Sequence, residues 1–259
     1  MLIRPAVATD AHFIVQLIQQ SFDPQMLKAM VYGCYGIDSY VKHCILTHEN
    51  LSDRVYVVAE EDDRVVGCIE LRLIGETVFL NYICTHANVC HKGLGRALLR
   101  EAIQLIGPSS YKKMSLDVFH DNLVAESWYE RLGFTGEYDI IWWSIPIPVC
   151  EIVAPGKISG IAQAAVCQRE FGFSQFSLNT TTASYSVGRL GSDWYRIFQE
   201  VLLNDNQALS TLHKLESGRR ILGLFRDNVT AHLLDKGTAF ARSVRMTVDI
   251  DLLLANLTN

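Results

Sequence analysis

The chain of 259 residues corresponds, at roughly 150 residues per domain, to one large domain or two smaller ones. Hydrophobic residues make up 49% of it and charged residues 20%, proportions that exclude a disordered chain, a collagen-like repeat and a coiled coil. The formal net charge of -5 excludes the strongly basic balance that is typical of nucleic-acid-binding proteins, so no nucleic-acid partner is expected.

Processing and compartment signals indicate a cytoplasmic protein. The first ten residues, MLIRPAVATD, lack the basic head and apolar core of a secretory signal. No segment contains about 20 consecutive apolar residues, so neither a membrane-spanning helix nor a membrane partner is expected. The seven cysteines are odd in number and follow no framework spacing, which predicts reduced thiols.

The chain begins with a pattern of strand, helix and hairpin. Leu2–Pro5 predicts a short strand, and Asp10 can cap a helix that runs to about Phe22. Two β-branched runs, Val55–Glu60 and Val65–Leu73, flank a short charged segment and therefore predict an antiparallel hairpin.

From there, strands and helices alternate as far as Ile145. The pattern predicts strands at Thr77–Thr85, Met114–Phe119 and Tyr138–Ile145, and helices at Leu94–Ile106 and between Asn122 and Gly133. Pro146 and Pro148 mark a boundary after the last of these strands. A hairpin that precedes parallel crossovers predicts an α/β fold with a mixed sheet, an α+β arrangement, over residues 1–146.

A glycine-containing turn, residues 90–97, joins a predicted strand to a predicted helix. Gly93 and Gly95 lack Cβ atoms, so successive backbone N–H groups can point at one anion beside the positive end of the helix. Lys92 and Arg96 are placed to neutralise further phosphate charge. The turn therefore predicts a phosphate site; the alternative is a helix entry that needs small residues for packing.

Three well-known phosphate-binding turns do not fit. A dinucleotide-binding turn has a third glycine where this chain has Leu98. A P-loop ends in Gly-Lys followed by Ser or Thr, and the chain contains no such run. The lysine, catalytic-loop and magnesium motifs that accompany a kinase glycine loop are also missing.

A fourth type of turn does fit. The segment Ile83–Leu99 resembles the acyl-CoA signature of the GNAT superfamily of N-acyltransferases, [QR]-x-x-G-x-[GA] after the fourth strand. Cys90 occupies the first position of that pattern, where the family has Gln or Arg. This departure puts one side-chain contact to the pyrophosphate in doubt and leaves the backbone donors in place.

A second block agrees in order and spacing. It resembles the family pattern N-x-x-A-x-x-x-Y-x-x-x-G-F at Asn122, Ala125, Tyr129, Gly133 and Phe134. Taken alone, this block is a capped helix whose tyrosine would more often be packing than catalysis. Together the two blocks imply a GNAT domain that binds acetyl-CoA over residues 1–146.

The resemblance implies a role for each matching residue. Two parallel strands would splay apart and expose backbone groups of Ile83, Cys84 and Thr85 to the pantetheine arm. Asn122 would lie near the same arm, and Tyr129 would be the general acid that protonates the leaving thiolate. The pyrophosphate would lie on the amides of the turn, namely Cys90, His91, Lys92, Gly93, Leu94, Gly95 and Arg96.

The implied function is transfer of an acetyl group from acetyl-CoA to a primary amine of a small molecule or protein. A non-catalytic acyl-CoA-binding sensor or interaction module is the alternative, which Cys90 favours and Tyr129 opposes. The general base is open: Glu70 and Glu76 lie on or beside strands, where surface carboxylates are more common. The variable segment 26–50 carries few acids, so a strongly cationic acceptor is not specially indicated.

No metal is expected. Cys84, His86, Cys90 and His91 form a tempting group, but their spacing differs from zinc knuckles and two of them are adjacent. A reactive thiol at Cys90, beside a helix N-terminus, is the better alternative.

Residues 149–259 contain no recognisable catalytic motif. Ser159–Glu170 predicts a helix, Ser192 and Asp193 could cap another that contains Trp194, and Ala239–Ile250 predicts a strand. Within this strand, Ala239–Met246 resembles the final strand region of tandem GNAT-like acyltransferases, whose C-terminal half is a reduced GNAT-like domain. Such a half would cover the substrate or mediate homodimerisation; an unrelated α/β accessory domain is the alternative.

Overall fold

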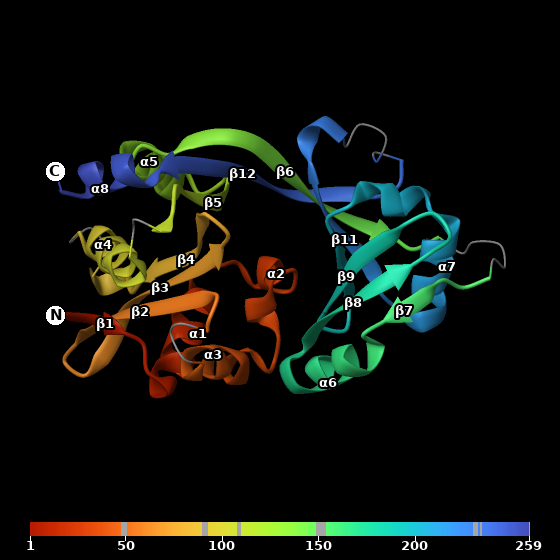
Figure 1. Cartoon of the computed structure of the whole chain (residues 1–259), viewed down its shortest axis with the longest axis horizontal. Helices are drawn as coiled ribbons and strands as arrows, with labels where there is room; N and C mark the ends of the chain where they lie inside the picture. The colour runs from red at the N-terminus through yellow and green to blue at the C-terminus, as the bar shows by residue number, and fades with distance from the viewer. Residues whose placement is uncertain are drawn as a thin grey trace. The chain divides into compact units, whose positions relative to one another are not determined.

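The computed structural model describes residues 1–47, 51–89, 93–107, 110–148, 154–229, 233 and 235–258. The chain divides into two compact units (Figure 1). Unit 1 comprises residues 1–24, 38–138 and 244–259, and unit 2 comprises residues 25–37 and 139–243. Each compact unit is built from separate stretches of the chain. The domain boundary predicted between residues 146 and 149 stays a prediction.

Unit 1 contains a mixed sheet, as the sequence predicts. In sheet order its strands are β1 (Leu2–Pro5), β2 (Arg54–Glu61), β3 (Arg64–Ile74), β4 (Thr77–Thr85), β5 (Lys113–Phe119) and the parts of β12 (Thr238–Asp249) and β6 (Thr135–Pro146) that belong to this unit. Neighbouring strands from β1 to β4 are antiparallel, and β4 and β5 are parallel. The turn of the hairpin is made by Asp62 and Asp63, both with positive φ.

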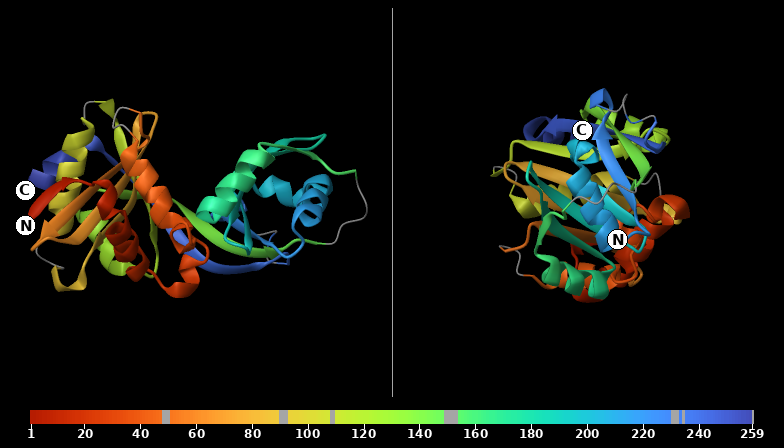
Figure 2. Two further views of the ribbon diagram at one scale, coloured as in Figure 1. Left: turned by 90° about the horizontal axis from the view of Figure 1, so that it is seen from below. Right: turned by 90° about the vertical axis from the view of Figure 1, so that its right-hand side faces the viewer.

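Helices cover both faces of this sheet. The helices are α1 (Ala11–Gln20), α3 (Ile37–Leu46), α4 (Leu94–Ile106), α5 (Leu123–Arg131) and α8 (Ile250–Thr258). Residues of α4, α5 and α8 share one buried cluster with Val57, Ile69 and Leu71 of the sheet. In Figure 2, α8 (blue) lies beside α4 (yellow), which it contacts. Among the described residues, no helix combines the length and apolarity needed to span a membrane.

The start of α1 differs in detail from the prediction. Asp10 stands at the N-cap position, but its carboxylate does not cap the helix. Instead it accepts the backbone N–H of Val7 (2.8 Å) and pairs with the guanidinium of Arg4 (2.6 Å). Asp10 therefore ties β1 to the turn before α1.

Unit 2 repeats part of this arrangement. Its strands are β7 (Lys157–Ser159), β8 (Phe173–Asn179), β9 (Ser184–Leu190), β10 (Trp194–Ile197), β11 (Arg220–Arg226) and the remaining parts of β6 and β12. The helices are α6 (Ile161–Phe171), α7 (Asn206–Leu215) and part of the short α2 (Pro24–Leu27). The parallel strands β10 and β11 are joined through α7, as β4 and β5 are joined through α4.

The helix predicted after Ser192 and Asp193 is wrong. Trp194 begins β10, in which Tyr195 and Ile197 are buried while their neighbours are half-buried. This period of two is the strand pattern, and it was hidden because the apolar residues farther along also fit helical spacing. The helix of this region is α7, whose N-cap is Asp205.

Two strands carry the chain from one unit to the other. β6 begins in unit 1 and ends in unit 2, and β12 makes the return. The returning segment adds six buried apolar residues to the core of unit 1: Val244, Met246, Val248, Ile250, Leu253 and Leu257. Residues 244–258 are therefore part of the core of unit 1, which is also the unit that contains the predicted acyl-CoA residues.

Candidate functional site

The turn before α4 is shaped by one glycine. Gly93 is the N-cap of α4 and has φ of 75°, a left-handed conformation that disfavours other residues. A Cβ at Gly93 would meet no atom within 4 Å, so the glycine is needed for its conformation rather than for space. The predicted residues Cys90, His91 and Lys92 lie outside the described residues.

The first amides of α4 are candidate anion donors. The N–H of Ala97 donates to the carbonyl of Gly93, which begins the helical ladder. The amides of Leu94, Gly95 and Arg96 precede that bond, so helix geometry gives them no acceptor within α4. They lie at the positive end of a helix of 13 residues, which favours an anion such as a pyrophosphate.

Gly95 and Arg96 also lie against neighbouring elements of unit 1. A Cβ at Gly95 would lie 3.4 Å from Cζ2 of Trp128 and 3.9 Å from Cδ1 of Ile83. A Cβ there would make ordinary van der Waals contacts with α5 and β4, so both elements lie beside this position and the space does not itself require glycine. Arg96 donates from Nη1 to the backbone carbonyl of Asn256 in α8 (3.0 Å), so this guanidinium also fixes the last helix.

β4 and β5 pair along only part of their length. Their parallel register runs from Thr77 opposite Lys113 to Leu80 opposite Leu116. Both strands continue beyond that point, β4 to Thr85 and β5 to Phe119, without further pairs in these fully described strands. We call this opening the fork. Ile83, Cys84 and Thr85 lie on its β4 side, along which an extended ligand could bind.

A β-bulge lies where the fork begins. On β3, Glu70 is opposite Tyr82 and Leu71 is opposite Leu80, so Asn81 is an extra residue of β4. An extra residue bends a strand and reverses which face its side chains occupy. Leu80 accordingly packs in the cluster with α4, and after the bulge Ile83 does so.

Cys84 lies on the other face of β4, opposite Cys68 of β3. Both thiols are buried and free. The thiol of Cys68 lowers the pKa of Cys84 by hydrogen bonding, burial opposes this, and the hydroxyl of Ser21 supports it. Cys84 also lies close enough to Tyr129 to act on the pKa of its phenol.

Tyr129 comes from α5 and is only 8% exposed. Its ring centroid lies 5.6 Å from that of Phe134 and 5.0 Å from that of Trp128. Burial raises the pKa of the phenol, and the charge of Cys84 acts in the same direction. The hydroxyl therefore stays protonated at neutral pH, as a proton donor must.

Asn122 stands at the N-terminus of the same helix. Its side-chain oxygen accepts the backbone N–H of Ala125 (3.2 Å), so it caps α5. The two residues of the second sequence block, Asn122 and Tyr129, are thus placed by one helix. The cap explains the local spacing of the block, and the asparagine side chain itself is exposed.

The two carboxylates considered as bases have different surroundings. Glu76 is exposed and pairs with Lys112 (2.7 Å), as expected of a surface carboxylate. For Glu70 that expectation is wrong: it is 0% exposed and forms an ion pair with Arg54. A carboxylate that is buried and paired in this way is not placed to take a proton from a substrate.

No group of three or more potential metal ligands occurs among the described residues. Of the four residues considered for zinc, Cys84 is buried in the sheet and His86 is exposed beyond the end of β4. The Nδ1 atom of His86 accepts the backbone N–H of Asn88 (3.3 Å). Cys90 and His91 lie outside the described residues.

Unit 2 has a helix N-terminus in the position that α4 occupies in unit 1, but a carboxylate already fills it. Oδ1 of Asp205 accepts the N–H of Ala208 at the start of α7 (3.0 Å). Its Oδ2 accepts hydroxyl hydrogen bonds from Thr180 (2.7 Å), Thr182 (2.8 Å) and Tyr185 (3.0 Å). These bonds lower the pKa of Asp205 against the effect of burial, so the carboxylate is ionised.

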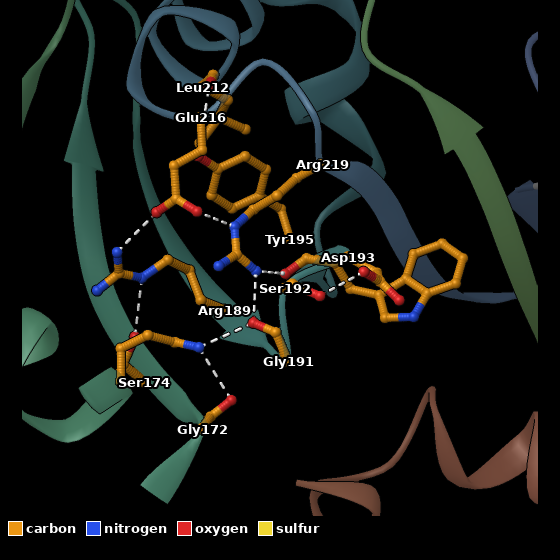
Figure 3. Close-up of polar contacts among 12 residues, drawn as sticks. Gly172, Ser174, Arg189, Gly191, Ser192, Asp193, Tyr195, Leu212, Glu216 and Arg219 are labelled. Atoms are coloured by element: carbon orange, nitrogen blue, oxygen red, sulfur yellow. Dashed lines mark hydrogen bonds and ion pairs between the residues drawn. The ribbon is translucent and has the colours of Figure 1, made fainter. Parts of the chain in front are cut away.

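A second polar cluster of unit 2 holds its strands together (Figure 3). Glu216 lies between two buried arginines: it accepts from Nη1 of Arg189 (2.8 Å) and from Nε of Arg219. Arg219 also donates to the carbonyls of Gly191 (2.9 Å) and Trp194 (3.1 Å). The cluster thereby links β9, the turn before β10 and the end of α7.

Sequence reasoning missed the bulge at Asn81 and the ion pair beneath it. The signal was present in the apolar alternation of β4, since Val78 and Leu80 are even-numbered and Ile83 is odd-numbered. A change of parity within one strand is the pattern of a bulge. No such signal predicts that β12 and α8 pack in the core of unit 1, because the pattern of a strand or helix does not identify the element it packs against.

The sequence was compared with those of known proteins. A family model described as "Acetyltransferase (GNAT) family" matches residues 22–134. The uncharacterized N-acetyltransferase YhfO of Bacillus subtilis (strain 168) is 25% identical over 156 residues, which are 57% of this chain and 99% of that protein. The spermidine N(1)-acetyltransferase of Thermoplasma acidophilum is 24% identical over 116 residues, 45% of this chain and 71% of that protein.

The structure was compared with solved ones. A tandem GNAT protein from the clavulanic acid biosynthesis pathway superimposes with a TM-score of 0.63 and 14% sequence identity. The match covers 96% of this chain and 98% of that protein. The likeness is one of fold and extends over both units.

Proposed function

Because a model of the acetyltransferase (GNAT) family matches residues 22–134, within a chain whose fold resembles that of a tandem GNAT protein, we propose that this enzyme transfers an acetyl group from acetyl-CoA to a primary amine. The observation that carries the proposal is the fork. It opens beside the uncapped N-terminus of α4, with a buried, protonated tyrosine next to it. The acceptor would be the amine of a small molecule or a protein.

The donor would bind along the fork. The amides of Leu94, Gly95 and Arg96 would hold the pyrophosphate, with Lys92 adding positive charge to the same turn. The pantetheine arm would lie along Ile83, Cys84 and Thr85, near Asn122. Cys90 and His91 would complete the turn through their backbone amides.

The chemistry needs one proton donor and a neutral amine. The amine nitrogen would attack the thioester carbonyl, the C–N bond would form and the C–S bond would break. Tyr129 would then donate its phenolic proton to the leaving thiolate. Alkylamines are mostly protonated at neutral pH, so the acceptor must lose a proton before it attacks.

The two units would have different roles. Unit 1 would bind acetyl-CoA, and the GNAT-like unit 2, which contains most of residues 149–259, would be an accessory domain. Asp205 supports this division, because a carboxylate at the N-terminus of α7 repels a pyrophosphate. We place the enzyme in the cytoplasm, since the five cysteines of the described part are free thiols.

An amine acceptor is supported by the spermidine acetyltransferase among the relatives. The direct test is to measure thiol release from acetyl-CoA with a panel of polyamines, aryl amines, aminoglycosides and peptide amines. Amine-dependent release is expected, with acetyl-CoA binding in the micromolar range that calorimetry detects. Binding without release for any amine would instead indicate a non-catalytic acyl-CoA sensor.

A further inference from the structure

The carboxylate of Glu70 is buried at the base of the fork. It lies within β3 and is 0% exposed. A buried charge is stable only when paired and hydrogen-bonded. Its Oε1 atom accepts from Nη1 of Arg54 on β2 and from Nδ2 of Asn81 on β4 (2.9 Å). One oxygen thus joins three neighbouring strands.

Asn81 is the bulged residue itself. Glu70 is opposite Tyr82 and Leu71 is opposite Leu80, so the ladder between β3 and β4 gives Asn81 no partner residue. Its side-chain amide is therefore what ties the extra residue to the sheet. The pairing between β4 and β5 ends one residue earlier, at Leu80.

The ion pair of Arg54 and Glu70 also has contacts with neighbouring tyrosines. The guanidinium of Arg54 lies 5.5 Å from the ring centroid of Tyr40 on α3, a cation–π contact. Tyr56 of β2 is buried and stands opposite Glu70, whose charge raises the pKa of its phenol together with burial. Burial lowers the pKa of Arg54, but the charge of Glu70 together with nearby Tyr40 and Tyr56 offsets this, so the pKa of the guanidinium is raised overall.

We propose that Glu70, fixed by Arg54, is a positioning residue for acetyl-CoA: it holds Asn81 in the bulge and so keeps β4 apart from β5 where the thioester would lie. It acts through Asn81 and touches no reacting atom. The inference rests on the proposed function, because only a ligand in the fork makes the opening useful.

The test compares two substitutions that remove the same charge. Glu70→Gln keeps an oxygen that can accept from Asn81, whereas Glu70→Leu keeps neither charge nor acceptor. Both leave Arg54 without its carboxylate, so both should lower the melting temperature. Calorimetry should show a Kd for acetyl-CoA raised about tenfold by Glu70→Leu and clearly less by Glu70→Gln. Equal Kd values in the two variants would overturn the inference.

Asn81→Ala provides an independent test, because it leaves the pair of Glu70 and Arg54 intact and should fold even if Glu70→Leu does not. It too should raise the Kd about tenfold, with a smaller loss of melting temperature than Glu70→Gln. If the role were merely structural, Glu70→Gln, which loses more melting temperature, would also raise the Kd more than Asn81→Ala. An unchanged Kd in Asn81→Ala would overturn the inference.

Asp10→Asn is the matched control. Asp10 is 5% exposed and pairs with Arg4 in the same unit, at β1 rather than at the fork. It should lower the melting temperature and leave the Kd unchanged. If the unaltered protein fails to bind acetyl-CoA, the proposed function itself is overturned, which distinguishes that failure from a failure of the positioning role.

Discussion

Tyr129 is the residue on which the chemistry of the proposed reaction depends. It is buried, protonated and close to Cys84 of the fork. Tyr129→Phe should lower kcat about 100-fold or more, the usual effect of losing a general acid, because the ring still packs while the proton is gone. The Kd for acetyl-CoA should change less than about threefold.

The measurement is thiol release with the best amine, together with calorimetric titration of acetyl-CoA. Tyr195→Phe is the control, since Tyr195 is equally buried but lies in unit 2. An unchanged kcat in Tyr129→Phe would reduce Tyr129 to a packing residue.

The same phenol predicts how stability depends on pH. Burial raises the pKa of Tyr129 above its ordinary value of about 10. The folded state therefore holds the proton in a range where the unfolded state has lost it, so this contribution is complete below about pH 10 and is lost as pH rises above it. Each such group lowers the free energy of unfolding by about 1.4 kcal/mol per pH unit there.

Urea unfolding between about pH 9.5 and 11 should show a shallower decline for Tyr129→Phe than for the unaltered protein. Tyr35→Phe, at a side chain that is 72% exposed, serves as the comparison. An identical slope for Tyr129→Phe would contradict the assigned burial of the phenol.

Two glycines flank helix α4, and substitutions at them can separate the effects on backbone conformation and on ligand binding. Gly93 at its N-terminus has φ of 75° and Gly107 at its C-terminus has φ of 70°, and a Cβ at either would meet nothing within 4 Å. Gly93→Ala and Gly107→Ala should each lower the free energy of unfolding by roughly 1 kcal/mol, the cost of a left-handed conformation.

Only Gly93→Ala should also weaken acetyl-CoA binding, because the amides proposed to bind the pyrophosphate lie at that end of α4. Chemical denaturation and calorimetry on the two variants provide the measurement. Weaker binding in both variants would indicate a general loss of stability, and in neither would remove the anion site from this turn.

Much of the fold could be predicted for elements whose signals are local. The bounds of β4 and α4 match the prediction, since β-branched runs, helical spacing and the terminal glycines all lie within those segments. The region of Trp194 failed because its apolar residues fit both periods. The change of parity in β4 indicates the bulge at Asn81, but the partners of Glu70 could not be predicted, because they arise from pairing between strands that a single-chain pattern does not encode.

The two units are joined by more than a linker. Residues 244–259 supply six buried apolar side chains to unit 1, and at about 1.5 kcal/mol each these contribute about 9 kcal/mol. This is comparable with the whole stability of a typical domain, roughly 5–15 kcal/mol. A fragment of residues 1–148 should therefore be unfolded or aggregated rather than an active acetyltransferase.

Circular dichroism and acetyl-CoA titration of that fragment test the expectation. Its matched control joins residues 244–259 to the fragment through a flexible linker, which should restore a cooperative unfolding transition and binding. A fragment that folds and binds without this segment would show that β12 and α8 are dispensable.

The return of β12 also has a consequence for synthesis of the protein on the ribosome. Residues 1–138 emerge before most of unit 2, yet the strand that lies between β5 and β6 in unit 1 is translated only after residues 139–237. Until then, both strands present unpaired edges, which invite association with other nascent chains. The hydrogen bond from Arg96 to the carbonyl of Asn256 likewise forms only after α8 has been translated. The proposed acetyl-CoA site of the nascent enzyme should therefore form late, after unit 2 has been made, and the chain should depend on chaperones in the interval.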